Sequence, residues 1–352
     1  MQTKNLSLVV PALLALILAL VTLASADAAG HDGRIAFVQV SGSGTDIFTM
    51  KPDGTDVKQI TSFGTSGGQV GLVAWSHDGK QLVFSAVPSA NDSVQLWMMD
   101  AHGGNEHLLL DDPSNADLHP SFSPDDSKIA FARCGSINCA IFSVRVDGTG
   151  LTAITNFNRP DVIDLWPEYS PDGKKIAFTS LNRNNGFLCA IYTVDAHGLN
   201  FHLVTPPRLT AFQPDWSPDG TKIAFSTNSS SSTILDEEIW VINANGTQPR
   251  PLTENNRHWN GYLSGPHDYS ASWSPMGNKI VLEQDTPDFS SSAIYLINPD
   301  GRGKTLIFQG RQNSMPEFPW VRGVALGRLL TKRHLKLIQS GGFSPHWGPA
   351  PK

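Results

Sequence analysis

One short motif recurs at a fixed period through most of this 352-residue chain. An aromatic residue followed by Ser-Pro-Asp-Gly, or a close variant, and then by a strand like Ile-Ala-Phe begins at Trp75, Phe122, Tyr169, Trp216 and Trp273. The first four aromatics are 47 residues apart, and the last step is 57 residues. An earlier half-copy, Arg34-Ile-Ala-Phe37, places Ile35 another 47 residues before Leu82. Such a period means that one small structural unit is stacked repeatedly.

The local sequence of each copy predicts four short antiparallel strands. The aromatic strand ends at Ser-Pro-Asp-Gly, where Pro presets φ and Gly accepts positive φ, so that a hairpin closes. A third strand such as Ile191-Tyr-Thr-Val follows and ends in a second turn at Gly198, with equivalent turns at Gly54, Gly103, Gly148, Gly246 and Gly301. We expect a polar edge strand next, for example Ile154-Thr155 or Leu252-Thr253.

The inner strands are apolar on both faces, as expected where each small sheet is covered on both sides. Four-stranded sheets at this period predict an all-β chain folded as a β-propeller, whereas a β-sandwich would show shorter and less regular spacing. Six repeats predict six blades in one domain, 27–352. The predicted blades are 34–62, 72–110, 119–155, 166–205, 213–253 and 270–308.

The first blade lacks its own first strand. One period before Trp75 lies Ala28, in a polar segment unsuited to a strand. The C-terminal Ser344-Pro-His-Trp347 instead matches Gln213-Pro-Asp-Trp216. We therefore expect 343–349 to form a closing strand that completes the first blade, which would remove an open sheet edge.

Residues 1–26 have the pattern of an export signal. They contain the single cation Lys4, no acidic residue, an apolar run over 8–23, and a small-x-small end at Ala24-Ser-Ala26. An uncleaved membrane anchor is the alternative, because the run approaches a spanning length. The polar residues that follow favour cleavage. We predict a periplasmic or secreted protein with no membrane span after cleavage.

The composition narrows the class further. The formal net charge is −6, which argues against a nucleic-acid partner because a polyanion needs a basic patch. Charged residues make up 16% of the chain, below the usual 25% or so, while 31 Gly and 24 Pro suit many tight turns. Cys134 and Cys139 flank a predicted hairpin loop and are a candidate disulfide. Cys189 is interpreted as a buried small hydrophobic residue.

The string Pro-x-aromatic-Ser-Pro-Asp-Gly-x-x-Ile-Ala-Phe, followed by Ile-Tyr-x-Val-x-x-x-Gly, resembles the TolB-type (WD40-like, or PD40) propeller repeat of bacteria. The resemblance covers residue 34 to about residue 310 plus the last strand, and it is specific for fold rather than for function. The Trp-Asp dipeptide of WD40 chains is absent. Residues 27–33 leave no space for the N-terminal α/β domain of TolB, so contacts made through that domain are not carried over. Similar repeats occur in oligogalacturonate lyases and in prolyl-oligopeptidase-like peptidases.

Two formal motif matches carry no chemistry. Gly64-Thr-Ser-Gly-Gly68 fits the pattern of a nucleophile elbow, but it falls in a Gly-rich loop and no hydrolase domain follows. The recurring Asp-Gly and Asp-Asp pairs are predicted hairpin turns rather than calcium loops, because calcium needs several oxygens converging in one loop.

The residues three positions before each aromatic differ from repeat to repeat. They are Leu72, His119, Trp166, Gln213, Ser270 and Ser344. We expect them on the loop that enters each innermost strand, bordering the central channel, where the fold itself demands no particular residue. This mixed set is therefore a candidate ligand or partner site, and a solvated rim without a ligand is the alternative. Asp117 and Asp164 lie two residues earlier and are expected to face the same mouth.

The longest repeat contains a second candidate region, the loop 253–272. His258, Trp259, Tyr262 and His267 suit sugar stacking or an aromatic anchor for a protein partner. His258 and His267 with His119 would be the ligands of a divalent metal, but we predict no cofactor and no metal. The basic insert 311–342 fits either a strand or a solvated loop.

These features predict an exported, monomeric propeller that binds a protein of the envelope or the extracellular space through one funnel face. No catalytic residue is assigned, so the expected protein is not an enzyme. Two alternatives stay open. One is an oligogalacturonate-lyase-like enzyme acting on acidic sugars, with His119 and His258 or His267 near the channel. The other is a carbohydrate-binding module.

Overall fold

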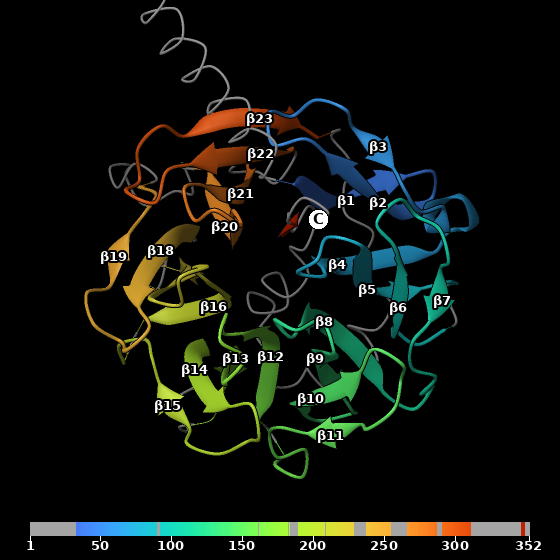
Figure 1. Cartoon of the computed structure of the whole chain (residues 1–352), viewed down its shortest axis with the longest axis horizontal. Helices are drawn as coiled ribbons and strands as arrows, with labels where there is room; N and C mark the ends of the chain where they lie inside the picture. Colours follow the sequence, from blue (N-terminus) through green and yellow to red (C-terminus); the bar gives the residue numbers. More distant parts are fainter. Residues whose placement is uncertain are drawn as a thin grey trace, which may run out of the picture.

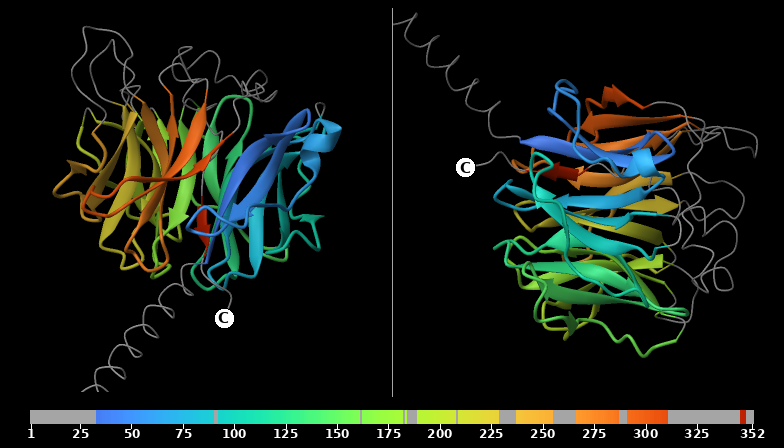
Figure 2. Two further views of the ribbon diagram at one scale, coloured as in Figure 1. Left: turned by 90° about the horizontal axis from the view of Figure 1, so that it is seen from above. Right: turned by 90° about the vertical axis from the view of Figure 1, so that its right-hand side faces the viewer.

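The computed structural model describes residues 33–89, 92–160, 162–181, 183, 189–207, 209–228, 237–254, 266–286, 291–310 and 346–348. Within these ranges the protein is all-β apart from one 3₁₀ turn, η1 (Phe63–Ser66). Short antiparallel strands form sheets that radiate from a central axis (Figure 1). The strands themselves run roughly along this axis (Figure 2). The predicted all-β propeller with four-stranded antiparallel blades is confirmed at this level.

The strands form sets of four, and each set is called here a unit. One sequence repeat supplies all four strands in units 2 to 6, whereas unit 1 takes one of its strands from the C-terminal segment. Unit 1 contains β1 (Arg34–Ser41), β2 (Gly44–Met50), β3 (Lys58–Gln59) and β24 (His346–Gly348). Unit 2 contains β4 (Gln69–Trp75), β5 (Gln81–Val87), β6 (Gln95–Asp100) and β7 (His107–Leu108). Unit 3 contains β8 (Ala116–Phe122), β9 (Lys128–Cys134), β10 (Cys139–Arg145) and β11 (Thr152–Ala153).

Unit 4 contains β12 (Ile163–Tyr169), β13 (Lys175–Leu181), β14 (Cys189–Asp195) and β15 (His202–Leu203). Unit 5 contains β16 (Thr210–Trp216), β17 (Lys222–Asn228), β18 (Glu237–Asn243) and β19 (Arg250–Pro251). Unit 6 contains β20 (His267–Trp273), β21 (Ile280–Asp285), β22 (Ser292–Ile297) and β23 (Thr305–Gln309). The first strand of units 2 to 6 therefore starts three residues earlier than the repeat alone predicted.

The hydrogen-bonded sheets do not number six. Units 1, 2, 5 and 6 are separate four-stranded sheets, whereas units 3 and 4 form one eight-stranded sheet. The cause is a single parallel pair between β10 and β12, Cys139 with Ile163, where the Cys139 N–H donates to the Val162 carbonyl. In unit 1, β24 pairs antiparallel with β1 through three residue pairs, from Arg34–Gly348 to Ala36–His346.

The core lies between neighbouring sheets. The second strand of each unit is buried on both faces, as Ile176, Ala177 and Phe178 in β13 illustrate with 0% exposure. The Phe at this place is fully buried in unit after unit: Phe37, Phe84, Phe131, Phe178 and Phe225. No helix long and apolar enough to cross a membrane was found among the described residues.

The edge strands differ from the prediction in position and length. Those of units 1 to 5 are only two residues long, and β11 and β19 precede the expected segments. The expected Thr155 and Thr253 lie just beyond them, where their hydroxyls accept the N–H of Ile141 at 2.9 Å and of Ile239 at 3.0 Å. A side-chain hydrogen bond thus continues the pairing where the edge strand stops.

The Ser-Pro-Asp-Gly segments form hairpin turns at the end of each first strand, as predicted. In unit 4, Asp172 Oδ1 accepts the Lys174 N–H at 3.1 Å, and Gly173 has a φ of 68°. A Cβ at Gly173 would lie 3.7 Å from Pro124 of the unit before, so Pro and Gly of adjacent units are in contact at this rim. The other Asp-Gly turns likewise hold their carboxylates on local N–H groups, for example Asp219 on Thr221.

The sequence's smaller predictions have mixed outcomes. The Cys134–Cys139 disulfide is present and joins directly opposed residues of β9 and β10. Cys189 is a free thiol but is partly exposed rather than buried, although desolvation raises its pKa to about 12. Ser66 lies in η1 and donates to the Phe63 carbonyl, so its segment is no nucleophile elbow. The export signal and the basic insert lie outside the described residues.

Candidate functional site

The predicted channel residues lie inside the first strands and not on the loops that enter them. Pairing between β8 and β9 shifts between Leu118 and Ser121, and His119 has a φ of 55°. The same bulge recurs at Trp166, Gln213 and Ser270, whose φ values are 50°, 54° and 55°. A bulge leaves residues out of the ladder and re-aims their side chains. The loop prediction was wrong because hydrophobic patterning does not reveal a bulge.

These bulges bring five members of the predicted set together around one axial cavity, called here the inner cavity. It has a volume of about 90 Å³ and is lined by Leu72, His119, Trp166, Gln213 and Ser270, among others. The imidazole of His119 stacks on the indole of Trp166, with ring centroids 4.7 Å apart and planes at 19°. Ser344, the sixth member, lies outside the described residues.

His119 is one of the two buried members of this set, with Ser270. Only 9% of it is exposed, and desolvation lowers the pKa of its imidazole to about 3, so the ring is neutral at physiological pH. Its Nδ1 atom has no hydrogen-bond partner among the described residues, and neither has the indole Nε1 of Trp166. Buried polar atoms are normally paired with protein, water or a ligand.

A second ring of channel residues was missed by the sequence analysis. The residue directly before each repeat aromatic also faces the axis, and these residues are Ala74, Ser121, Glu168, Asp215, Ser272 and His346. All six line a larger cavity of about 330 Å³, called here the outer cavity, and all but Ser121 also line the inner cavity. Variation from repeat to repeat, the signal that singled out the earlier position, marks this position equally well.

Glu168 and Asp215 give this second ring its electrostatic character. Burial raises the pKa of Asp215 to about 7, although its Oδ2 accepts the Trp273 N–H at 2.6 Å. Burial, and then the charge of Asp215, raise the pKa of Glu168 well above its usual value. Neither Lys nor Arg is among the described residues that line the two cavities. Two carboxyl groups from adjacent units therefore face the channel with no Lys or Arg from its described walls.

His346 of β24 lies in the same ring. Its Nδ1 accepts the Trp75 N–H at 3.4 Å. Burial, and then the charge of His77, lower the pKa of its imidazole to about 4. A neutral imidazole whose Nδ1 accepts a hydrogen bond carries its proton on Nε2. His346 therefore adds a hydrogen-bonding group to the channel but no charge at physiological pH.

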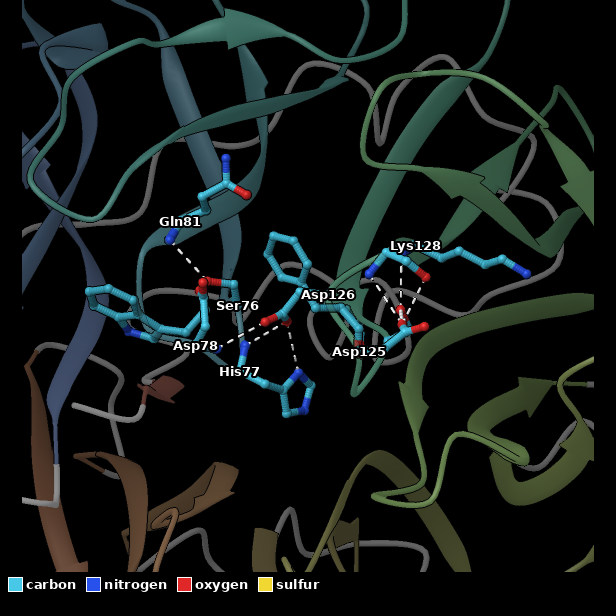
Figure 3. Close-up of polar contacts among 12 residues, drawn as sticks. Ser76, His77, Asp78, Gln81, Asp125, Asp126 and Lys128 are labelled. Atoms are coloured by element: carbon cyan, nitrogen blue, oxygen red, sulfur yellow. Dashed lines mark hydrogen bonds and ion pairs between the residues drawn. The ribbon is translucent and has the colours of Figure 1, made fainter. Parts of the chain in front are cut away.

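The outer cavity opens toward the rim turns. Its wall is built from the repeat's own residues: the aromatics Trp75, Phe122, Tyr169, Trp216 and Trp273 and the prolines Pro124, Pro171, Pro218 and Pro275. Unit 2 has His77 where the others have proline. The backbone N–H and the Nδ1 atom of His77 lie 2.7 and 3.2 Å from Oδ1 of Asp126 in unit 3. The Oδ2 atom of Asp126 accepts the Asp78 N–H (Figure 3).

The predicted carboxylates Asp117 and Asp164 do not join this site. Asp117 is fully buried within unit 3, where the Arg133 guanidinium donates to both of its oxygens at 2.8 and 2.7 Å. Asp164 is held by Ser180 and Arg183 within unit 4. Neither residue lines the inner or the outer cavity, so the expectation that they face the channel mouth was wrong. Their carboxylates are engaged in ion pairs of their own units.

Of the residues predicted on the long loop, the structure describes His267, which does not lie in the channel. His267 is 1% exposed at the start of β20, with Nδ1 3.9 Å from Glu237 Oε2 of unit 5, and lines neither cavity. His258, Trp259 and Tyr262 lie outside the described residues. In the part of the chain that the structure describes, no group of three or more His, Cys, Asp or Glu side chains has an arrangement that could hold a metal ion.

Comparison with known proteins identifies the fold. No protein-family model and no curated protein matches the sequence. TolB from Acinetobacter baumannii superposes with a TM-score of 0.67 at 21% identity, over 91% of this chain and 67% of that one. A protein described as a TolB from Agrobacterium tumefaciens gives 0.59 at 18% identity, over 80% and 91%. Oligogalacturonate lyase in complex with manganese gives 0.51 at 14%, over 80% and 74%. The chain has a TolB-like propeller fold.

Proposed function

We propose that this chain is a six-bladed propeller, closed by its C-terminal strand, that binds a protein of the cell envelope through its axial channel and catalyses no reaction. The six repeats and the pairing of β24 with β1 support the closed ring. The export-signal pattern of residues 1–26 supports an envelope location. The protein acts as an exported, monomeric scaffold without a cofactor.

One observation carries the binding role. The rim turns contain a residue with positive φ, and so do the channel bulges of units 3 to 6. The rim uses Gly79, Gly173, Gly220 and Gly277 for this conformation. The channel uses His119, Trp166, Gln213 and Ser270 for the same backbone conformation. A left-handed conformation costs a non-glycine residue roughly 1–3 kcal/mol, and such strain persists where a side chain has a use.

The shape of the channel favours a protein partner. The outer cavity has about 330 Å³ of space walled by aromatic and proline side chains, and it leads to a ring of polar groups. Buried aromatic walls with a few polar groups are the usual setting of an interface hot spot, where one inserted side chain contributes much of the affinity. A partner therefore has room to insert a side chain along the axis.

Affinity capture tests this proposal. The chain from residue 27 onward is immobilised and exposed to envelope extract, beside a variant carrying His119→Ala and Trp166→Ala. We expect a protein that the wild-type chain retains and the variant loses. An Asp111→Asn variant serves as the control, because Asp111 is exposed and lines neither cavity. Failure of wild-type chain to retain any protein from the extract contradicts the scaffold role.

A lyase acting on acidic sugars is the second candidate, favoured by one electrostatic feature. A general base works best with a pKa near the operating pH, and burial brings Asp215 to about 7. The predicted base His119 fits less well, since a pKa of about 3 makes its imidazole weakly basic. Oligogalacturonate with added Mn²⁺ is the substrate to try. New ultraviolet absorbance from the unsaturated product, lost in Asp215→Asn, would favour the lyase.

A further inference from the structure

We infer that the channel is a receptor for a primary ammonium group, presented by a lysine side chain of the partner, with Glu168 and Asp215 as its counter-charges. This inference rests on the proposed binding function and names the chemistry that the channel recognises. It concerns two residues that occupy the same repeat position in units 4 and 5 and face the same space.

The charge of the channel is the first argument. Glu168 and Asp215 line both cavities, and neither Lys nor Arg is among the described lining residues. Two like charges placed this close disfavour each other's ionisation, and an inserted cation reverses that penalty. The other channel side chains around them, Ser272, Gln213 and the neutral His346, are uncharged, so none of them offsets the charge that either carboxyl gains on ionisation.

The second argument comes from groups that already point to a ligand. His119 is nine-tenths buried and lines the inner cavity, yet its Nδ1 has no partner among the described residues. A neutral imidazole can offer that nitrogen as an acceptor. The Trp166 ring stacked on it supplies an aromatic face, and indole is the best aromatic partner for a cation. An ammonium group has three donors and no acceptor, which suits these surroundings.

The sizes of the two cavities select the shape of the cation. The inner cavity has about 90 Å³, room for a few water molecules, so it admits a small head group and excludes a sugar ring. The outer cavity is wider and is walled by Trp75, Trp216 and Trp273 together with the rim prolines. A lysine has a compact charge on a flexible apolar stem, and it buries such a stem along apolar surface. The apolar stem of a lysine therefore fits the outer cavity, and its ammonium head group fits the inner cavity.

The test uses small amines and needs no partner protein. The chain from residue 27 onward is titrated with Nα-acetyl-lysine amide and with Nα-acetyl-norleucine amide, the uncharged analogue that lacks the terminal amine. Tryptophan fluorescence and calorimetry measure the binding. We expect binding of the lysine compound only. A variant with Glu168→Gln and Asp215→Asn should bind it at least tenfold more weakly, because each lost charge-assisted hydrogen bond is worth that much. Asp111→Asn, which removes an exposed charge outside both cavities, should stay within about twofold of wild type.

Each outcome of this titration either supports or overturns the inference. The inference is overturned if the lysine and norleucine compounds bind equally well. It is also overturned if wild type and the carboxamide variant bind the lysine compound equally well, or if the lysine compound does not bind. A stronger response to Nα-acetyl-arginine amide overturns the choice of lysine. Thermal melting of the carboxamide variant shows that it is folded. If affinity capture retains a partner while the lysine compound fails to bind, only this inference is lost and the proposed scaffold function stands.

Discussion

The rim turns and the channel bulges use the same backbone conformation with opposite residue choices. At the rim, the residue with positive φ is Gly79, Gly173, Gly220 or Gly277, and its neighbour across the units is a proline in three of the joints. In the channel, no described bulge residue with positive φ is a glycine. The rim is therefore built for stability, whereas the channel accepts strain in order to present side chains.

Among the described rim turns, one exception shows what a non-glycine residue there needs. Asp126 has a φ of 55°, and its carboxylate accepts the backbone N–H groups of His77 and Asp78 from unit 2 (Figure 3). A proline at position 77 has no N–H to give. The two departures from the repeat thus meet across one joint and compensate each other. The side chains of the channel bulges at His119 and Trp166 have no such compensation for their buried nitrogens among the described residues.

The largest expected effect is the loss of folding stability caused by the buried carboxyl groups of the channel. Folded Asp215, with a pKa of about 7 against an ordinary 3.8, holds a proton between pH 4 and 7 that the unfolded chain has lost. Stability therefore falls as pH rises through this window. We expect Glu168→Gln with Asp215→Asn to raise the free energy of unfolding at pH 8 by on the order of 3 kcal/mol. Urea unfolding at pH 5 and pH 8 measures it.

That gain should shrink as the pH falls toward 4, where the folded carboxyls stay protonated and the unfolded ones begin to regain their protons. The exposed control Asp111→Asn should change little at either pH. A carboxamide variant that is less stable than wild type at pH 8 would mean that the acid pair supports the ring, and the contrast between channel and rim would be broken.

The second effect lies at the rim joint between units 2 and 3. His77→Pro removes the ring and the N–H that Asp126 accepts, and a lost hydrogen bond to a charged group costs about 2 kcal/mol. Adding Asp126→Gly restores the proline and glycine pair of the other joints, so most of that loss should return. A double-mutant cycle from urea midpoints gives the coupling energy. Strictly additive effects would show that the two exceptions are independent.

Much of this organisation follows from the sequence because it repeats. The 47-residue period gave the architecture, and opposed positions beside a hairpin gave the disulfide of Cys134 with Cys139. The bulge was not predictable, because His119-Pro and Trp166-Pro read as strand entry when only apolar periodicity is considered. Glu168 and Asp215 were not predicted because each directly precedes the repeat aromatic, and the repeat was aligned on that aromatic. Their raised pKa values arise from a cavity shared by several units, which no single repeat encodes.

A smaller effect is expected when serine and glycine are exchanged at one channel position and at one rim position. Ser270 in the channel and Gly220 at the rim have φ values of 55° and 67°. Ser270→Gly relieves a left-handed serine and should stabilise the chain by about 1 kcal/mol, while Gly220→Ser should destabilise it by a similar amount. The nearest atom to a Cβ at Gly220 is 3.8 Å away, so only backbone strain enters. Thermal melting checks both, and destabilisation by Ser270→Gly would place Ser270 among the structural residues.

The smallest expected effect tests how closely the rim turns depend on their aspartate. Unit 6 has Met276, 59% exposed, where the other turns have Asp, and Ser274 donates instead to Asn278 Oδ1 at 2.9 Å. Met276→Asp gives Ser274 and the N–H of residue 278 the acceptor that Asp219 supplies in unit 5 at 2.6 and 3.0 Å. At this exposed position we expect a gain of about 0.5 kcal/mol in unfolding free energy, read from the urea midpoint. Met276→Ala is the control for loss of the exposed methionine. An equal gain from both would mean that hydrophobic exposure, and not the turn carboxylate, limits this joint.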